Sequence, residues 1–194
     1  MGRGELLFLK KRWKILKMVS GVMFKKYRGD SEKFVLSANH CAEVLVQKIV
    51  DDLPYFSDIN KYNHLKIYFY KRAQILISDI WGAFDGKGVG EFNDLEYLTA
   101  FTDYKIPQIL RYLKILEFED DLEDKIDSRK IIAVGSKEEI EIRSATIWAV
   151  EYLRQALEKY GKKFYAFQVD WLLWNKAQDI DFDFPHHLTK TIFY

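Results

Sequence analysis

The segment that most constrains the fold is residues 135–161, GSKEEIEIRSATIWAVEYLRQALEKYG. Ser136 and Glu139 have the spacing of a capping box, and Gly161 can end a helix. These features predict one long helix, and a helix of this length must bury one side against other elements. The predicted buried side includes Ile140, Thr146, Ile147 and Val150.

Other segments show similar helical spacing of apolar residues, and a helix is predicted for each. The tetrapeptide IYFY at residues 67–70 has the composition of a strand, but no pairing partner is evident in the sequence. The tail from residue 182 is predicted to be irregular and aromatic. We therefore expect an all-α fold with short connections, forming a single domain over residues 1–194. The further predicted helices cover residues 6–27, 35–51, 73–84, 107–116 and 167–181.

Composition and charge exclude several classes of protein. Thirty basic and 29 acidic residues give a net charge of +1, which does not indicate a broad nucleic-acid-binding surface. A single cysteine allows no internal disulfide and favours a reducing compartment, so we expect a cytoplasmic protein. No apolar run reaches membrane-spanning length. The basic N-terminal segment fits an amphipathic helix better than the alternative, a mitochondrial presequence.

Metal binding, thiol chemistry and phosphate-loop chemistry have weak support in the sequence. His186 and His187 are adjacent, but the other two histidines are distant in sequence and there is no HExxH or paired CxxC motif. We therefore expect neither a metal nor a cofactor. Cys41 lies in an apolar stretch and is predicted to be a buried structural residue within a helix. Residues 82–92, GAFDGKGVGEF, lack the P-loop pattern and are predicted to be a loop.

Asp103 stands between aromatic residues, just before Pro107 at the start of a predicted helix. Its short side chain can accept backbone N–H groups as a helix cap or Asx-turn. The pattern favours that structural role, although the same acid can be the working group of an enzyme.

Asp170 is followed by Trp171, and Trp174 lies one helical turn further on. An acid beside indole rings suits a planar ligand that bears an amide. The alternative is an amphipathic helix with an acid at its solvent edge. Four basic residues are candidates for binding phosphate, although single basic residues are usually solvated: Lys71, Arg72, Lys105 and Arg111.

Several segments together, in order and spacing, resemble one family, the queuosine salvage proteins or queuosine 5′-phosphate N-glycosylase/hydrolases. The resemblance extends over nearly the whole chain, but family members carry a further N-terminal part. It implies that residues 1–194 correspond to the C-terminal two thirds of a family member. The segments that carry it most clearly are residues 68–84, 98–116, 135–154, 169–179 and 185–194.

The resemblance implies a helical fold akin to helix-hairpin-helix DNA glycosylases. It also implies hydrolysis of the N-glycosidic bond of queuosine 5′-monophosphate, releasing queuine for reuse in tRNA modification. Asp103 falls on the acid expected to be the nucleophile or transition-state stabiliser. Asp170 falls on an acid expected to contribute to base recognition or activity. The residues adjacent to these acids become candidates for the substrate pocket: Phe101, Thr102, Tyr104, Trp171 and Trp174.

Two alternatives remain. Without the family's N-terminal part, the chain can be a non-catalytic binding or scaffold protein, or its pocket can be completed by self-association or a second chain. A base-excision DNA glycosylase is disfavoured, because the net charge is near neutral and no LPGxG-type hairpin precedes Asp103. The partner that the resemblance implies is a small-molecule substrate, queuosine 5′-monophosphate, and we expect no direct DNA or membrane binding.

Overall fold

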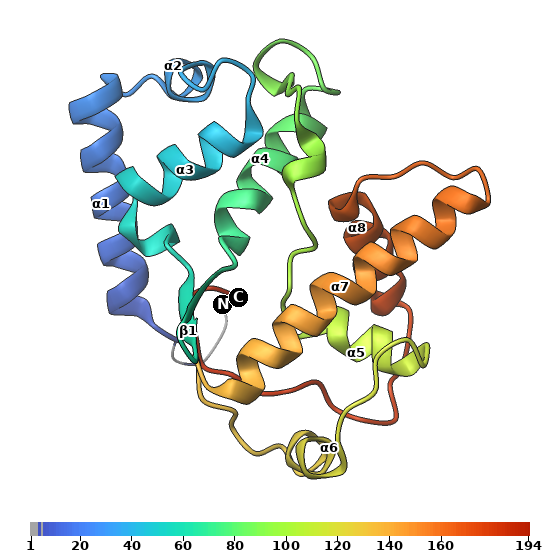
Figure 1. Cartoon of the computed structure of the whole chain (residues 1–194). Coiled ribbons are helices and arrows are strands. Elements are labelled where there is room, and N and C mark those ends of the chain that lie inside the picture. The colour runs from blue at the N-terminus through green and yellow to red at the C-terminus, as the bar shows by residue number, and fades with distance from the viewer. Residues whose placement is uncertain (1–3, 5) are drawn as a thin grey trace.

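The computed structural model describes Gly4 and residues 6–194, and it is mainly helical, as the sequence predicts (Figure 1). Three short 3-10 turns and a two-stranded sheet complete the secondary structure of the described residues. In chain order, the α-helices and strands are α1 (Leu9–Tyr27), α2 (Ser31–Leu36), α3 (Ala42–Asp52), β1 (Ile59–Tyr62), β2 (Leu65–Tyr68), α4 (Lys71–Ala83), α5 (Lys105–Tyr112), α6 (Asp120–Asp127), α7 (Lys137–Lys159) and α8 (Ala166–Gln178).

Two large apolar clusters divide the interior. One is built mainly from α2, α3 and α4, and it also takes in Phe101 and Phe167. The other is built from α5, α7 and α8. The segment at residues 98–104 runs between the two halves, as the chain passes from α4 to α5 (Figure 1). Side chains on this segment are therefore positioned by both halves.

The prediction of one helix over residues 35–51 is wrong, because the chain breaks between α2 and α3. Asn39 and His40 both adopt positive φ, and Cys41 is the N-cap of α3 rather than a residue inside a helix. The carboxylate of Asp94 accepts N–H groups at the start of α3 and the thiol of Cys41. This cap comes from more than 40 residues away, so local sequence patterns do not reveal it.

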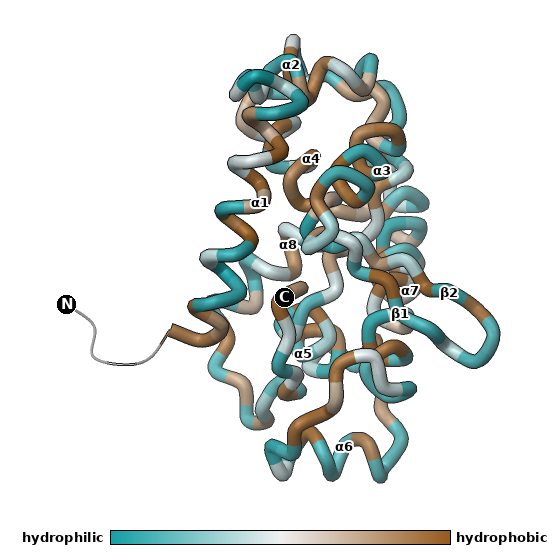
Figure 2. The backbone as a smooth tube through the Cα atoms, turned by 90° about the vertical axis from the view of Figure 1, so that its left-hand side faces the viewer, coloured by the Kyte–Doolittle hydropathy of each residue, from teal (hydrophilic) through white to brown (hydrophobic). Residues whose placement is uncertain are grey.

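The structure fits the prediction of a helical fold, with one small two-stranded sheet that was not predicted. Strand β2 includes part of the IYFY segment, and its partner β1 lies immediately upstream in an antiparallel hairpin. Asn63, at the two-residue turn, has a φ of 53°. Figure 2 shows the hairpin extending from the helices. The acidic helix α6 was not predicted, and α5 begins at Lys105, before Pro107, and ends four residues earlier than expected.

Helix α7 confirms the prediction for its segment. The Ser136 hydroxyl accepts the N–H of Glu139, and Gly161 follows the helix with a φ of 75°. The Glu139 carboxylate departs from the capping-box pattern, because it accepts the N–H of Gly135 and is fully buried. The irregular tail then returns to this end of α7, where Ile132 donates its N–H to the carbonyl of Leu188.

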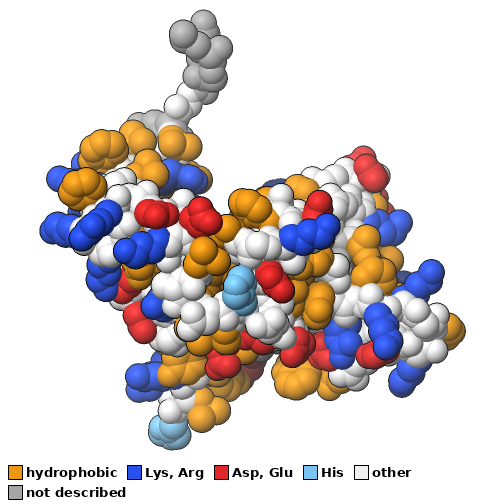
Figure 3. Space-filling model, turned by 90° about the horizontal axis from the view of Figure 1, so that it is seen from above, with side chains coloured by type: hydrophobic (Ala, Val, Ile, Leu, Met, Phe, Trp, Pro, Cys, Tyr) orange, Lys and Arg blue, Asp and Glu red, His pale blue; other side chains and the backbone are white. Residues whose placement is uncertain are grey.

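Helix α1 covers one side of the first apolar cluster but leaves much of its apolar surface exposed. Leu9, Trp13 and Leu16 are each at least 60% exposed. Figure 3 shows hydrophobic side chains interspersed with Lys and Arg on this part of the surface. Within the part of the chain that the structure describes, no helix is long and apolar enough to cross a membrane.

Candidate functional site

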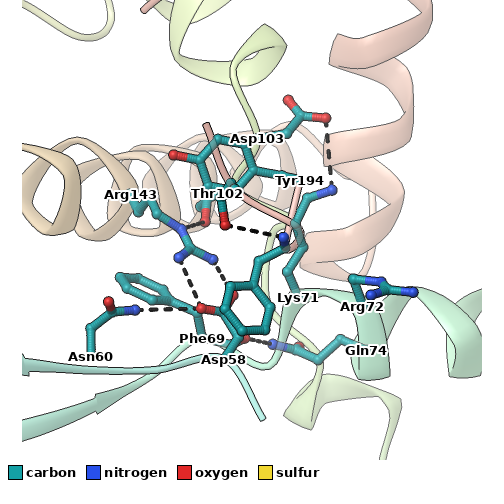
Figure 4. Close-up of polar contacts among 12 residues, drawn as sticks. Asp58, Asn60, Phe69, Lys71, Arg72, Gln74, Thr102, Asp103, Arg143 and Tyr194 are labelled. Atoms are coloured by element: carbon teal, nitrogen blue, oxygen red, sulfur yellow. Dashed lines mark hydrogen bonds and ion pairs between the residues drawn. The ribbon is translucent and has the colours of Figure 1, made fainter. Parts of the chain in front are cut away.

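Asp103 is held at the entrance of α5 by the backbone that follows it. Its Oδ1 accepts the N–H groups of Lys105 at 2.7 Å and Ile106 at 3.2 Å, which is the predicted Asx-turn geometry. Its Oδ2 lies 3.9 Å from the Nζ of Lys71 (Figure 4). Two backbone donors and one ammonium group therefore stabilise the charged carboxylate and fix its position.

Lys71 is the first residue of α4 and follows Tyr70, which adopts a left-handed φ of 47°. Its side chain is buried, and desolvation lowers the pKa of Lys71 against the opposing effects of Asp103 and Asp170. A separation of 3.9 Å from Asp103 is too long for a hydrogen bond. Both groups therefore keep donor and acceptor capacity that a bound substrate can use.

Asp170 lies on α8 and is 3% exposed, so the alternative of an acid at a solvent edge is wrong. Its Oδ2 accepts the N–H of Phe101 at 2.8 Å. Desolvation and then the charge of Asp103 raise the pKa of Asp170 to about 8, although Lys71 and the N–H of Phe101 oppose the shift. At neutral pH, Asp170 is therefore mostly protonated. Its hydrogen bond from Phe101 fixes the segment that leads to Asp103.

A second set of buried charges, which we name the Arg143 cluster, consists of Arg143, Asp58, Glu139, Thr102 and Tyr194. Both terminal nitrogens of the Arg143 guanidinium donate to the Asp58 carboxylate, and its Nε donates to the Thr102 hydroxyl at 3.2 Å (Figure 4). The Glu139 carboxylate accepts from Arg143 at 3.4 Å and from the Tyr194 hydroxyl at 3.0 Å. The cluster therefore ties α7, the loop before β1 and the tail to the residue before Asp103.

The sequence analysis missed the Arg143 cluster, although a signal was present. Glu139 and Arg143 are four residues apart on the same side of α7 as Thr146 and Val150. An acid and a base on the buried side of a helix indicate a buried ion pair. Nearby, burial lowers the pKa of His187 to about 4, so this imidazole is neutral at physiological pH.

The other predicted pocket residues are divided between the interior and the surface. Phe101 is buried against Phe167, and Tyr104 packs on His186 with ring centroids 4.4 Å apart. Trp171 packs against Phe167 and Trp81 within the first apolar cluster. Trp174 is 44% exposed, so the shared helical face does not bring it into the interior with Asp170.

The four basic candidates also have different surroundings. Arg111 forms ion pairs with Glu123 and Asp127 of α6, so its charge is already matched. The Lys105 ammonium lies 4.9 Å from the centre of the Phe182 ring. Arg72 stacks at 4.6 Å over the Phe56 ring and lies beyond Lys71 as seen from Arg143 (Figure 4). Among the described residues, Lys71 is the one of these four that forms an ion pair with Asp103.

Among the described residues, no group of His, Cys, Asp and Glu side chains is arranged to hold a metal ion. The site instead offers a fixed carboxylate, a buried amine and a buried protonated acid. The carboxylate can stabilise positive charge that develops on a bound molecule, while the amine and the protonated acid are hydrogen-bond donors. The fold and site thus define a mainly helical protein with a carboxylate–lysine site where its two halves meet.

Comparison with known proteins places the chain in a family. The model of the queuosine salvage protein family matches residues 3–194, so the chain belongs to that family. It is 45% identical over 194 residues to the queuosine 5′-phosphate N-glycosylase/hydrolase of Sphaerobacter thermophilus. It is 39% identical over 184 residues to the protein of the same name from Dictyostelium discoideum, and 33% identical over 197 residues to that from Bos taurus.

The alignments cover nearly all of this chain but only part of each relative. They take in 100%, 94% and 96% of the chain for the three relatives in turn. The corresponding shares of the relatives are 60%, 57% and 58%. The chain therefore spans somewhat more than half the length of the curated relatives that it matches.

Proposed function

We propose that the chain hydrolyses the N-glycosidic bond of queuosine 5′-monophosphate and releases queuine. The names of its relatives support this reaction, and the observation that carries it is the position of Asp103. Its carboxylate is fixed by two backbone N–H groups and faces a buried amine 3.9 Å away. A rigid anion of this kind is what cleavage at a sugar carbon requires.

The proposed chemistry begins at C1′ of the ribose. As the bond from C1′ to the base nitrogen breaks, positive charge develops on the sugar and its electron pair leaves with the base. The Asp103 carboxylate stabilises that charge, water adds its hydroxyl to C1′, and the remaining proton reaches the departing base. The products are ribose 5-phosphate and queuine.

The leaving group increases the demand on Asp103. Queuine is a 7-deazapurine, so it has no N7 atom that an acid can protonate. More of the reduction in the barrier must therefore come from stabilisation of the sugar. The positive charge of the buried Lys71 side chain lies 3.9 Å from the Oδ2 of Asp103 and attracts that carboxylate without a hydrogen bond to it.

We infer that Asp170 holds the segment that carries Asp103 in position. We do not assign it the role of an ionised carboxylate that accepts two hydrogen bonds from the base. One of its oxygens is already occupied by the N–H of Phe101, and its raised pKa keeps it mostly protonated at neutral pH. Phe101, Thr102 and Tyr104 remain proposed pocket residues because they adjoin Asp103 on the segment between the halves. For Trp171 and Trp174 the support is weaker, since Trp171 is partly buried against the first apolar cluster and Trp174 lies at the surface.

We also propose that residues 1–194 form a single domain whose fold resembles that of helix-hairpin-helix DNA glycosylases, and that the protein is cytoplasmic. We further propose that it acts on a small molecule and does not bind DNA or membranes directly. Self-association is supported by the exposed apolar residues of α1, because large exposed apolar surfaces favour association.

The proposed reaction can be tested by incubating the purified chain with queuosine 5′-monophosphate and following queuine and ribose 5-phosphate by chromatography. Equal amounts of the two products are expected. No release by a folded chain, together with retained binding of the nucleotide, would instead support the non-catalytic binding protein. Repeating the assay at higher protein concentrations tests whether self-association completes the site.

A further inference from the structure

A cavity of about 630 Å³ lies beside the carboxylate–lysine site, between α1, the start of α4 and the C-terminal tail. Its volume falls within the range of roughly 300–1,000 Å³ that is common for small-molecule sites. Lys71 lines this cavity while also facing Asp103 at 3.9 Å. A ligand in the cavity is therefore within reach of the proposed reacting carboxylate.

The charged side chains that line this cavity have one sign. Arg12 of α1 and both Lys71 and Arg72 of α4 line it, and among the described residues no Asp or Glu side chain does so. The Arg12 Nε donates to the carbonyl of Leu7 at 3.0 Å, and its terminal nitrogens have no hydrogen-bond partner among the described residues. The positive end of the α4 dipole adds to the potential at the start of α4.

Three arginines of the described residues are exposed and form no ion pair, namely Arg12, Arg28 and Arg129, so Arg72 is best compared with the arginines that are at least partly buried. Arg111, Arg143 and Arg154 each form ion pairs with two carboxylate groups. No ion pair of Arg12 or Arg72 is present among the described residues, although Arg72 is partly buried and stacks on Phe56. Guanidinium groups without carboxylate partners, at the wall of a cavity, suit a phosphate group.

We infer that Arg12 and Arg72 bind the 5′-phosphate of a nucleoside monophosphate substrate in this cavity. This inference rests on the proposed function, because it places the phosphate on the far side of Lys71 from Arg143, with the ribose beside Asp103. It separates three of the four basic candidates of the sequence by role. Arg72 binds phosphate, Lys71 serves Asp103, and Arg111 holds α6 to α5.

The test compares queuosine 5′-monophosphate with the nucleoside queuosine. The double variant Arg12→Met/Arg72→Met should lower the ratio of kcat/KM for nucleotide over nucleoside by about tenfold or more, because charge-assisted contacts to phosphate are lost. Lys14→Met is the matched control, since Lys14 is an exposed cation on α1 that does not line the cavity. Its ratio should equal that of the wild type.

A binding measurement keeps the inference testable if neither substrate is hydrolysed. Calorimetry should then detect ribose 5-phosphate binding to the wild type and to Lys14→Met, with affinity at least about tenfold weaker in the double variant. Circular dichroism would confirm that the variants are folded. An unchanged nucleotide preference, or equal binding by wild type and the double variant, would overturn the phosphate site without bearing on Asp103.

Discussion

Two sets of buried charges meet at residues 102 and 103, and they differ in how completely they are paired. In the Arg143 cluster, the guanidinium is 1% exposed and donates to Asp58, Glu139 and Thr102. One residue along the chain, Asp103 and Lys71 stand 3.9 Å apart. The difference indicates that the Arg143 cluster holds the halves together, whereas the Lys71–Asp103 pair is left open for a ligand.

The difference follows from the cost of burying charge. A buried ion loses its hydration and needs a full set of partners to compensate. Arg143 has these partners, so removing it would leave two buried carboxylates without their cation. Lys71 and Asp170 are less fully compensated, and their displaced pKa values record this. Incompletely compensated groups of this kind cluster at functional sites.

The largest effect on stability is expected from Arg143→Met. Loss of one partner from a buried ion pair should lower the free energy of unfolding by about 3–5 kcal/mol. Arg154→Met is the matched control, because Arg154 also pairs with two glutamates but on the surface of α7, so its cost should stay below about 1 kcal/mol. Urea denaturation measures both, and equal costs would show that burial does not distinguish the cluster.

A smaller effect on stability but a large one on activity is expected from Lys71→Met. The two backbone donors still satisfy Asp103, so the free energy of unfolding should change by less than about 1 kcal/mol. Turnover should fall by about 100-fold, since the electrostatic partner of the carboxylate is lost. A loss of unfolding free energy as large as that of Arg143→Met would instead show that Lys71 has mainly a structural role.

The pH dependence of stability should change in Asp170→Asn. Because the folded-state pKa of Asp170 is raised to about 8, its contribution to stability is complete below its ordinary pKa and is lost as the pH rises to about 8. Asparagine can still accept the N–H of Phe101 but does not titrate. The variant should therefore lose less stability than the wild type as the pH rises.

The window from about pH 6.5 to 8 is the clearest for this comparison. His187, with its pKa lowered to about 4, affects stability below pH 6.5, where the unfolded imidazole takes up a proton first. Urea midpoints of the wild type and Asp170→Asn at both ends of the window give the result. Parallel changes in the two proteins would contradict a raised pKa at Asp170.

The smallest effect is expected from Ser136→Ala at the start of α7. The hydroxyl accepts the N–H of Glu139, so its loss should cost about 1 kcal/mol. Activity should be unchanged, because the cap is not part of the Lys71–Asp103 pair. Thermal unfolding and queuine release, measured on the same preparation, show whether stability and activity separate in this way.

Local patterns predicted most of the helices, because apolar spacing and caps such as Ser136 act within one or two turns. They failed where distant residues decide the structure. Asp94 caps α3 from more than 40 residues away. Strand β1 pairs with β2, but the polar sequence of β1 did not indicate a strand. Helix α6 is short and has two apolar residues, Leu122 and Ile126, and its ion pairs with Arg111 depend on the position of α5.

For the site, the sequence identified Asp103 and its Asx-turn, since both depend on adjacent residues. The resemblance to a family pointed to Asp170, but it did not reveal that Asp170 is mostly protonated, because the raised pKa depends on burial in the folded chain. Arg12 could not be chosen among the many basic residues of α1. Arg12 differs from the other basic residues of α1 because it lines the cavity, and this cavity forms only where α1, the start of α4 and the tail meet in the folded chain.

The most direct test of the central claim compares Asp103→Asn with Asp30→Asn. Both acids accept backbone N–H groups at the start of a helix, so both variants keep similar local structure, but only Asp103 faces Lys71. Queuine release from queuosine 5′-monophosphate should fall by about 1,000-fold in Asp103→Asn and stay at the wild-type rate in Asp30→Asn. Equal release by the folded wild type and Asp103→Asn would contradict the role assigned to this carboxylate.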